Sequence, residues 1–168
     1  QFKKAKGTEI GENILLDLFS KNGFTIISPE QLTLDEQIAV VRNTKLLCGI
    51  IGTLGHNMLF AKPEQHMILV NKTHNINVAQ MDINKMKNLD MTYIDSYLAE
   101  FPSLIGNGPF LITYSEMLNQ YVEKHNWKKP AEDVISETVL KRNLQEYEEM
   151  YRSRNLKNLR LVYEKNPD

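Results

Sequence analysis

The sequence predicts an α/β fold, a Rossmann-like, doubly wound and mostly parallel sheet followed by a long C-terminal helix. Three observations support this fold class. Segments with strand and helix patterns alternate from residue 9 to about residue 97. The strand segments 45–51 and 66–71 are apolar without alternation, as in strands covered on both faces. The contents of 42% apolar and 24% charged residues are average for a globular chain. Such alternation favours β-α-β crossovers.

The first expected elements are a helix, a strand and a second helix. Gly23 follows a helical pattern with one apolar face, which carries Ile10, Ile14, Leu15, Leu18 and Phe19. Residues 24–29, "FTIISP", are a β-branched run closed by a proline and predict a buried strand. Thr33 precedes Glu36 by three residues, the spacing of a capping box that opens the second helix.

The later segments indicate that the chain has two parts, a domain and a helical extension. Strands are expected at 45–51, 66–71 and 91–96, and a helix at 77–89. Ser115 is a suitable cap for a further helix, and apolar residues recur at helical spacing after Pro130. We therefore expect a Rossmann-like nucleotide-sugar-binding domain over 1–129 and a helical extension over 130–168 that packs on the domain or on a partner.

Charge and composition exclude several classes of protein. The chain has 20 Lys and Arg against 21 Asp and Glu, so no overall field attracts nucleic acid. No apolar run reaches the roughly 20 residues that span a bilayer. The lone Cys48 lies in an apolar run, which favours a packing role in a reducing compartment. The expected location is cytoplasmic.

The stretch "GIIGTLGHNMLFAKP", residues 49–63, is the first candidate binding site. It follows a buried strand, and ligands of open parallel sheets bind beyond the carboxyl ends of strands. Glycines there would let the backbone approach a diphosphate. The candidate residues are Gly49, Gly52, Thr53, Gly55, His56 and Asn57. The spacing is neither G-x-G-x-x-G nor a P-loop. The alternative is a tight turn with a solvent-exposed His56 and an Asn57 that caps its own helix.

A second group of polar residues follows the strand 66–71 and is expected at the same edge of the sheet. This second-rank group comprises Asn71, Lys72, Thr73 and His74, and its alternative interpretation is a plain loop. The other histidines show no metal-ligand spacing with one another or with Cys48, and no D-x-D triplet is present. We expect no metal and no cofactor.

The chain resembles the C-terminal half of glycosyltransferase family 61, including bacterial capsular-polysaccharide enzymes. The resemblance is strongest over residues 9–71 and rests on four motifs in order. These are a G-F pair, a P-E-x-L link, an E-Q pair and a glycine loop, matched here by Gly23 and Phe24, by Pro29, Glu30 and Leu32, by Glu36 and Gln37, and by Gly49, Gly52, Asn57 and Phe60. Glu12 falls where members often carry the Glu of an N-E pair.

The resemblance implies the donor-binding half of a GT-B glycosyltransferase, which inverts the anomeric centre without a metal. It would transfer a sugar from a nucleotide diphosphate to a glycan or lipid-linked acceptor in surface-polysaccharide synthesis, at the inner face of the membrane through a partner. Glu12, Glu30 and Glu36 then join the donor-binding candidates. Their alternatives are a favourable charge at a helix start, a turn residue and a capping box. The catalytic base is expected from an N-terminal domain, and no catalytic residue is assigned.

Departures from the family pattern support an alternative function. Many members read H-G-[AS]-G-L-T-N in the loop, whereas this chain has Ile51 at the His and Leu54 at the second Gly. The usual arginines near residues 7 and 8 are replaced by Gly and Thr, which leaves Lys3, Lys4 and Lys6 as local cations. The alternative is a non-catalytic nucleotide-sugar-binding or protein-interaction domain. A further alternative is a structural subunit whose C-terminal helix joins a larger complex, with Tyr147 and Tyr151 suited to the interface, and the same helix could form a homo-oligomer.

Overall fold

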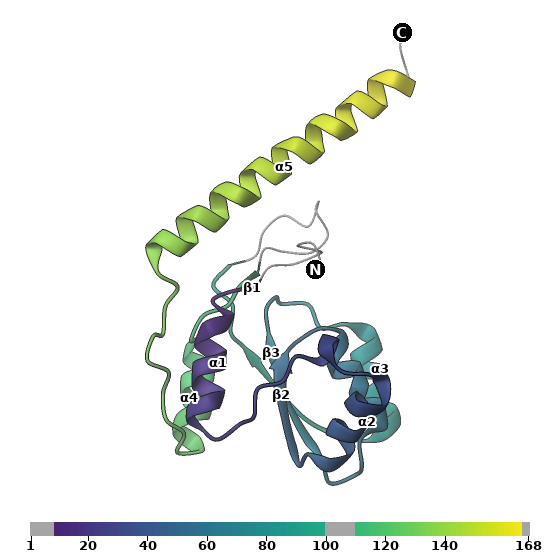
Figure 1. Ribbon diagram of the computed structural model, residues 1–168, viewed down its shortest axis with the longest axis vertical. Coiled ribbons are helices and arrows are strands. Elements are labelled where there is room, and N and C mark those ends of the chain that lie inside the picture. Colours follow the sequence, from purple (N-terminus) through teal and green to yellow (C-terminus); the bar gives the residue numbers. More distant parts are fainter. Residues whose placement is uncertain (1–8, 100–109, 166–168) are drawn as a thin grey trace.

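The computed structural model describes residues 9–99 and 110–165, and a parallel three-stranded sheet lies at its centre (Figure 1). The strands are β2 (Leu46–Ile50), β3 (His66–Asn71) and β4 (Asp90–Asp95), in the order β2-β3-β4. All of them point the same way, so their carboxyl ends share one edge. β3 is therefore central, and within residues 9–99 and 110–165 β2 pairs with a strand on one side only.

Helices cover both faces of this sheet (Figure 1). α1 (Glu12–Lys21) and α4 (Glu116–Lys124) lie on one face. The 3₁₀ helix η2 (Thr53–Phe60), α2 (Leu34–Asn43) and α3 (Val78–Lys87) lie on the other.

Successive side chains of β3 point to opposite faces of the sheet, so the chain has one hydrophobic core on each face. Ile68 and Val70 pack with α1 and α4, whereas Met67 and Leu69 pack with α2 and η2. The chain is thus mixed α/β with a parallel sheet between helical layers, which is compatible with the Rossmann-like class.

A second, two-stranded parallel sheet pairs β1 (Glu9–Ile10) with β5 (Phe110–Leu111). Ile112, which follows β5, forms an antiparallel bridge with Tyr97 beyond the end of β4. This small sheet places β1, and the start of α1 after it, close to the carboxyl ends of the main strands.

The second helix begins and ends where the sequence predicts, but the first begins at Glu12, so Ile10, expected on its apolar face, lies in β1 instead. α1 buries four of its apolar residues, and Gly23 after it has a φ of +81° that favours glycine. The Thr33 side chain caps α2, accepting from the Glu36 N–H at 3.3 Å, while Glu36 Oε2 accepts from the Thr33 N–H at 2.7 Å. The predicted capping box is confirmed.

The strand predicted for residues 24–29 is wrong. Residues 24–28 form neither helix nor strand, and η1 (Pro29–Gln31) is a short 3₁₀ helix. Ile26 and Ile27 are 46% and 43% exposed, and no neighbouring backbone among the described residues pairs with them. β2 is a strand as predicted, and its side chains pack against both cores, but all its residues are only half-buried.

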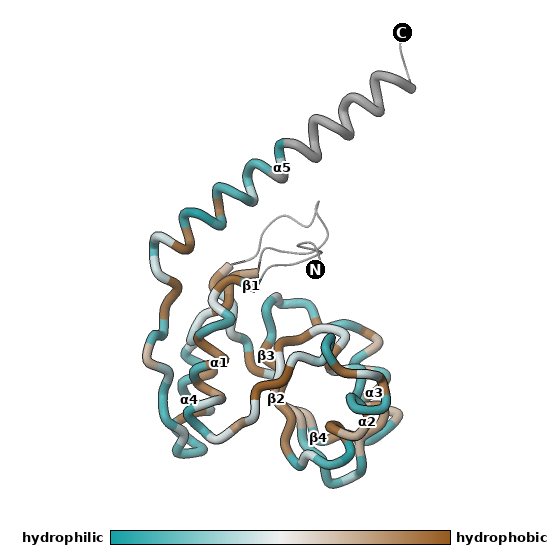
Figure 2. The backbone as a smooth tube through the Cα atoms, viewed as in Figure 1, coloured by the Kyte–Doolittle hydropathy of each residue, from teal (hydrophilic) through white to brown (hydrophobic). Residues whose placement is uncertain are grey.

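α5 (Glu137–Lys165) follows the layered part of the chain and extends away from it (Figure 1). Up to residue 152, the described side chains of this helix are mostly hydrophilic (Figure 2). No helix within the described ranges is both long and apolar enough for a membrane span. The expectation that 130–168 packs on the domain or on a partner stays a prediction.

Candidate functional site

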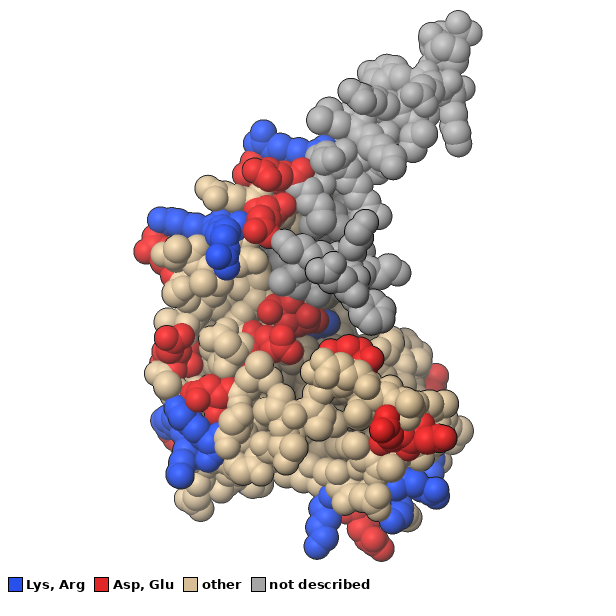
Figure 3. Space-filling view, in the orientation of Figure 1, with Lys and Arg blue, Asp and Glu red and all other residues tan. Residues whose placement is uncertain are grey.

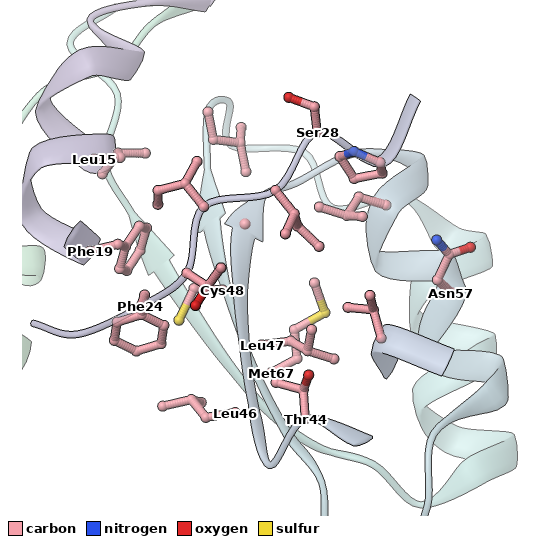
Figure 4. A pocket seen from close by; sticks show the side chains of 18 of the residues that line it. Leu15, Phe19, Phe24, Ser28, Thr44, Leu46, Leu47, Cys48, Asn57 and Met67 are labelled. Atoms are coloured by element: carbon pink, nitrogen blue, oxygen red, sulfur yellow. The ribbon is translucent and has the colours of Figure 1, made fainter. Parts of the chain in front are cut away.

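A cavity of about 830 Å³ lies along β2 and is the candidate site; we call it the β2 cavity. Its walls come from α1, residues 22–30, α2, β2 and η2 (Figure 4). Phe19 and Phe24 stand on one side with ring centroids 5.4 Å apart in an edge-on arrangement. Leu47 and Met67 line it on the sheet, and Asn57 stands on the opposite side (Figure 4). Most of its walls are apolar, as in small-molecule sites.

Carboxylates gather at the end of the β2 cavity that faces the carboxyl edge of the sheet. Glu9, Glu12 and Glu30 all line it there. Lys72 Nζ lies 2.6 Å from Glu9 Oε1 and 4.1 Å from the ring centroid of Phe110. Figure 3 shows acidic side chains grouped near the middle of this face, where Figure 1 places the start of α1. Among the residues that the structure describes, this end of the cavity carries more negative than positive charge.

The electrostatics of Glu12 reflect that group. Reduced hydration at the cavity, followed by the negative charges of Glu9 and Glu30, raises the pKa of the Glu12 carboxyl, and Lys72 opposes the rise. A carboxylate in this position accepts hydrogen bonds readily from hydroxyl groups and repels phosphates. The arrangement therefore suits the hydroxyls of a sugar better than a diphosphate.

The structure separates the predicted donor-binding residues into two groups. Glu12, Glu30, Gly49 and Asn57 line the β2 cavity together. The remaining first-rank residues are not among its lining: Gly52, Thr53, Gly55, His56 and Glu36. The cavity thus unites residues from α1, η1, β2 and η2.

Packing explains two of the three glycines in the loop. A Cβ on Gly49 would lie 2.8 Å from Leu54 Cδ2, and one on Gly55 would lie 2.4 Å from Gln80 Oε1. Gly52 has nothing within 4 Å of that position and an extended backbone that any residue adopts. Close packing inside β2 and η2, and not a tight turn, therefore accounts for Gly49 and Gly55. Only at Gly52 is there open space beside the backbone for a ligand.

His56 and Asn57 both lie within η2, after its first turn, with different surroundings. His56 is half-buried, and its Nε2 has neither exposed surface nor a hydrogen-bond partner. Asn57 Nδ2 donates to Gln37 Oε1 at 3.1 Å, and Gln37 Nε2 donates to Pro29 O at 3.0 Å. Asn57 therefore does not cap η2, whose N-cap is Gly52. It ties η2 to the P-E-x-L link through Gln37.

Glu36 has a local structural role. Its carboxylate accepts from both the N–H and the Oγ1–H of Thr33 at 2.7 and 2.8 Å. These hydrogen bonds to Thr33 lower the pKa of the Glu36 carboxyl. The capping box fully accounts for this residue, and a contact with the donor stays a prediction.

The second-rank residues lie just beyond β3, at the carboxyl edge. Asn71 is buried and donates from Nδ2 to Asp95 Oδ1 at 2.7 Å, while its own Oδ1 has no partner. Lys72 pairs with Glu9, and Thr73 Oγ1 forms a turn with the backbone of Asn75. His74 is exposed. None of these residues lines the β2 cavity.

Sequence reasoning did not identify Glu9 as a cavity residue, and it did not identify Gln37 as the hydrogen-bond partner of Asn57. Glu9 comes three residues before Glu12 at a strand-to-helix junction, a signal that would have placed both carboxylates at one sheet edge. Cys48 behaves as expected of a packing residue, since burial raises the pKa of its thiol to about 12. Within the described residues, no three His, Cys, Asp or Glu side chains form a group that could hold a metal ion. Lys3, Lys4 and Lys6 lie outside those residues.

Comparison with known proteins finds one family. The family model described as Glycosyltransferase 61 matches residues 3–68, which is less than half of the chain. No curated protein and no solved structure matches. Every residue that lines the β2 cavity, from Glu9 to Met67, falls inside the matched segment. The recognition of glycosyltransferase family 61, made from motifs in this part of the chain, is confirmed.

Proposed function

We propose that this chain is the donor-binding half of a GT-B glycosyltransferase. The observation that carries the proposal is that the family match and the cavity lining cover nearly the same part of the chain. The segment matched by glycosyltransferase family 61 contains the whole lining of the β2 cavity. A nucleotide-diphosphate sugar is the donor, and a glycan or lipid-linked hydroxyl in capsular or other surface polysaccharide is the acceptor.

The charges of the site suggest an orientation for the donor. The carboxylates of Glu12 and Glu30 accept hydrogen bonds from sugar or ribose hydroxyls, and the apolar walls with Phe19 and Phe24 surround the rest of the nucleoside. The diphosphate lies toward Gly52 and Thr53, where the backbone is open. His56, whose Nε2 has an unused hydrogen-bonding position, stabilises the leaving diphosphate after a local rearrangement.

The reaction is an inverting, metal-independent substitution. The acceptor oxygen bonds to the anomeric carbon, the bond from that carbon to the diphosphate oxygen breaks, and the nucleoside diphosphate leaves with its electron pair. A base from an N-terminal domain takes the acceptor proton. The enzyme works in the cytoplasm of a bacterium, at the inner membrane face through a partner, with residues 130–168 joining that partner or a second copy.

Calorimetry with uridine, guanosine and cytidine diphosphate sugars, without added metal, tests the proposal. We expect one donor to bind more tightly than about 1 mM, a free energy of about 4 kcal/mol. Glu12→Gln and Glu30→Gln each weaken that binding by about 1.5–3 kcal/mol, as expected for a hydrogen bond to a charged group. Glu64→Gln is the matched control, because Glu64 is exposed and outside the cavity. If no donor binds in the millimolar range, the proposal fails.

A second function is favoured by the negative end of the cavity. Lys72 is the only Lys or Arg with a described contact there, and it pairs with Glu9. A domain that binds a sugar nucleotide without transferring the sugar would fit such a site. Release of nucleoside diphosphate in the presence of acceptor, measured with the complete enzyme, separates the two functions, because only the transferase releases it.

A further inference from the structure

The free edge of β2 exposes a row of backbone groups to the cavity. Lys45 O accepts from His66 N, and Ile51 N donates to Val70 O, both at 2.9 Å. In a parallel pair, alternate residues direct their N–H and C=O to opposite sides of a strand. Residues 45, 47, 49 and 51 therefore face β3. The N–H and C=O of Leu46, Cys48 and Ile50 face the other way, beside the β2 cavity.

No backbone group among the described residues pairs with that edge. The cavity wall next to it is mainly apolar. Backbone groups left without partners in such surroundings are costly, and a free strand edge is a template for another strand. The edge of β2 therefore favours the pairing of one more extended segment.

Residues 24–28 form neither helix nor strand and line the same cavity. They have the same length as β2, five residues. In Figure 4 the chain from Phe24 to Ser28 runs toward the carboxyl end of β2, so the two segments are oriented alike. α2 connects them, which is the connection required between neighbouring parallel strands.

Both ends of this segment are fixed, and its middle is not. Phe24 N donates to Phe19 O at 3.1 Å, and the Phe24 ring lies 5.3 Å from that of Trp127. At the other end, Pro29 O accepts from Gln37 Nε2. Between these anchors, Ile26 and Ile27 are nearly half-exposed although β-branched residues favour strands. The segment is a strap that can move without losing its anchors.

We propose that residues 24–28 close on β2 as a fourth parallel strand, giving the order (24–28)-β2-β3-β4, and that the structure has the open form. Closure pairs the N–H and C=O groups of Leu46, Cys48 and Ile50 and removes the β2 cavity. A ligand in the cavity holds the strap open, so binding and closure exclude each other. This inference goes beyond the proposed function and does not depend on the identity of the ligand.

Amide hydrogen exchange of the ligand-free chain, resolved by residue, tests closure. We expect the amides of Leu46, Cys48 and Ile50 to exchange at least about 100-fold more slowly than in an unstructured peptide. Leu47 and Gly49 are internal controls, since their amides face β3 in both forms. Fast exchange at Leu46, Cys48 and Ile50 with slow exchange at Leu47 and Gly49 would overturn the proposal.

Two neighbouring proline variants sharpen the test. Only alternate N–H groups of a strand face a given partner, so one of Ile26→Pro and Ile27→Pro abolishes the slow exchange at Leu46, Cys48 and Ile50 while the other preserves it. Equal exchange in both variants, with Leu47 and Gly49 still protected, contradicts strand pairing. Should a variant lose protection at Leu47 and Gly49 as well, its fold is lost and the wild-type result decides.

Discussion

β2 and β3 are neighbouring strands of similar composition with different surroundings. Both are continuous apolar runs, and their residues align one to one across the sheet. Residues 67–71 of β3 are buried, whereas every residue of β2 is half-buried. β3 has a strand at each edge, but β2 has a strand at one edge and a cavity at the other. An apolar run therefore predicts a strand and does not reveal its place in the sheet.

The largest effect expected from this contrast is on stability. Leu69→Ala in β3 should lower the free energy of unfolding by about 2–5 kcal/mol, because Leu69 is fully buried and the change leaves a cavity. Leu47→Ala in β2 should cost about 1–2 kcal/mol, since this side chain already borders a cavity. Urea unfolding measures both. Equal losses would contradict the looser packing of β2.

The pH dependence of stability probes Cys48 in β2. Burial raises the pKa of the folded-state thiol from 9.0 to about 12, so folding favours the protonated form. The stabilisation is complete below pH 9 and is lost as the pH rises toward 12, with a maximum loss of roughly 4 kcal/mol. The free energies of unfolding of the wild type and of Cys48→Ala should therefore converge or cross between pH 9 and pH 12. A constant difference would show that the thiol is not buried.

The loops that follow the two strands should differ in ligand binding. His56→Ala, after β2, should weaken donor binding by about 1–3 kcal/mol if Nε2 bonds to the diphosphate. Thr73→Ala, after β3, should change it by less than about 0.5 kcal/mol, because the Thr73 hydroxyl forms a local turn. Calorimetry with the best donor measures both variants. If His56→Ala changes donor affinity as little as Thr73→Ala does, His56 has a structural role and does not contact the donor.

The smallest effect concerns α2, which connects the 24–28 segment to β2. Thr33→Ala removes the N-cap and should cost about 1 kcal/mol. The loss appears as a lower unfolding midpoint in urea, with donor binding unchanged. Thr92→Ala is not a suitable control, since its hydroxyl contacts His66, whereas Thr138→Ala changes an exposed hydroxyl outside the β2 cavity. A binding defect in Thr33→Ala would show that Glu36 contacts the donor.

Local signals in the sequence predicted most of the elements. The apolar faces of α1 and the Thr33–Glu36 spacing located two helices, because helix periodicity and capping depend on residues close in the chain. The strand expected at residues 24–29 failed because strand formation requires hydrogen bonds from a distant partner. The local sequence around Ile26 and Ile27 does not show whether β2 lies close enough to form hydrogen bonds with them.

The candidate site was predictable only in part. Glu12, Glu30, Gly49 and Asn57 were named from the sequence and line one cavity. Packing explains Gly55 by its contact with Gln80, a residue 25 positions later in the chain. The approach of Glu9 to Lys72 likewise depends on how the small β1-β5 sheet lies beside the carboxyl end of β3. Contacts of this kind follow from the three-dimensional arrangement and have no local pattern.

The central claim is that the β2 cavity binds a sugar-nucleotide donor, and an NMR titration of backbone amides tests it most directly. With the donor that binds best, we predict shift changes at Glu12, Glu30, Gly49 and Asn57. No change is expected at His66 and Asp90, which pair at 2.8 Å on the opposite, amino-terminal edge of the sheet. Absence of changes at the cavity residues at millimolar donor, or changes confined to His66 and Asp90, would contradict the claim.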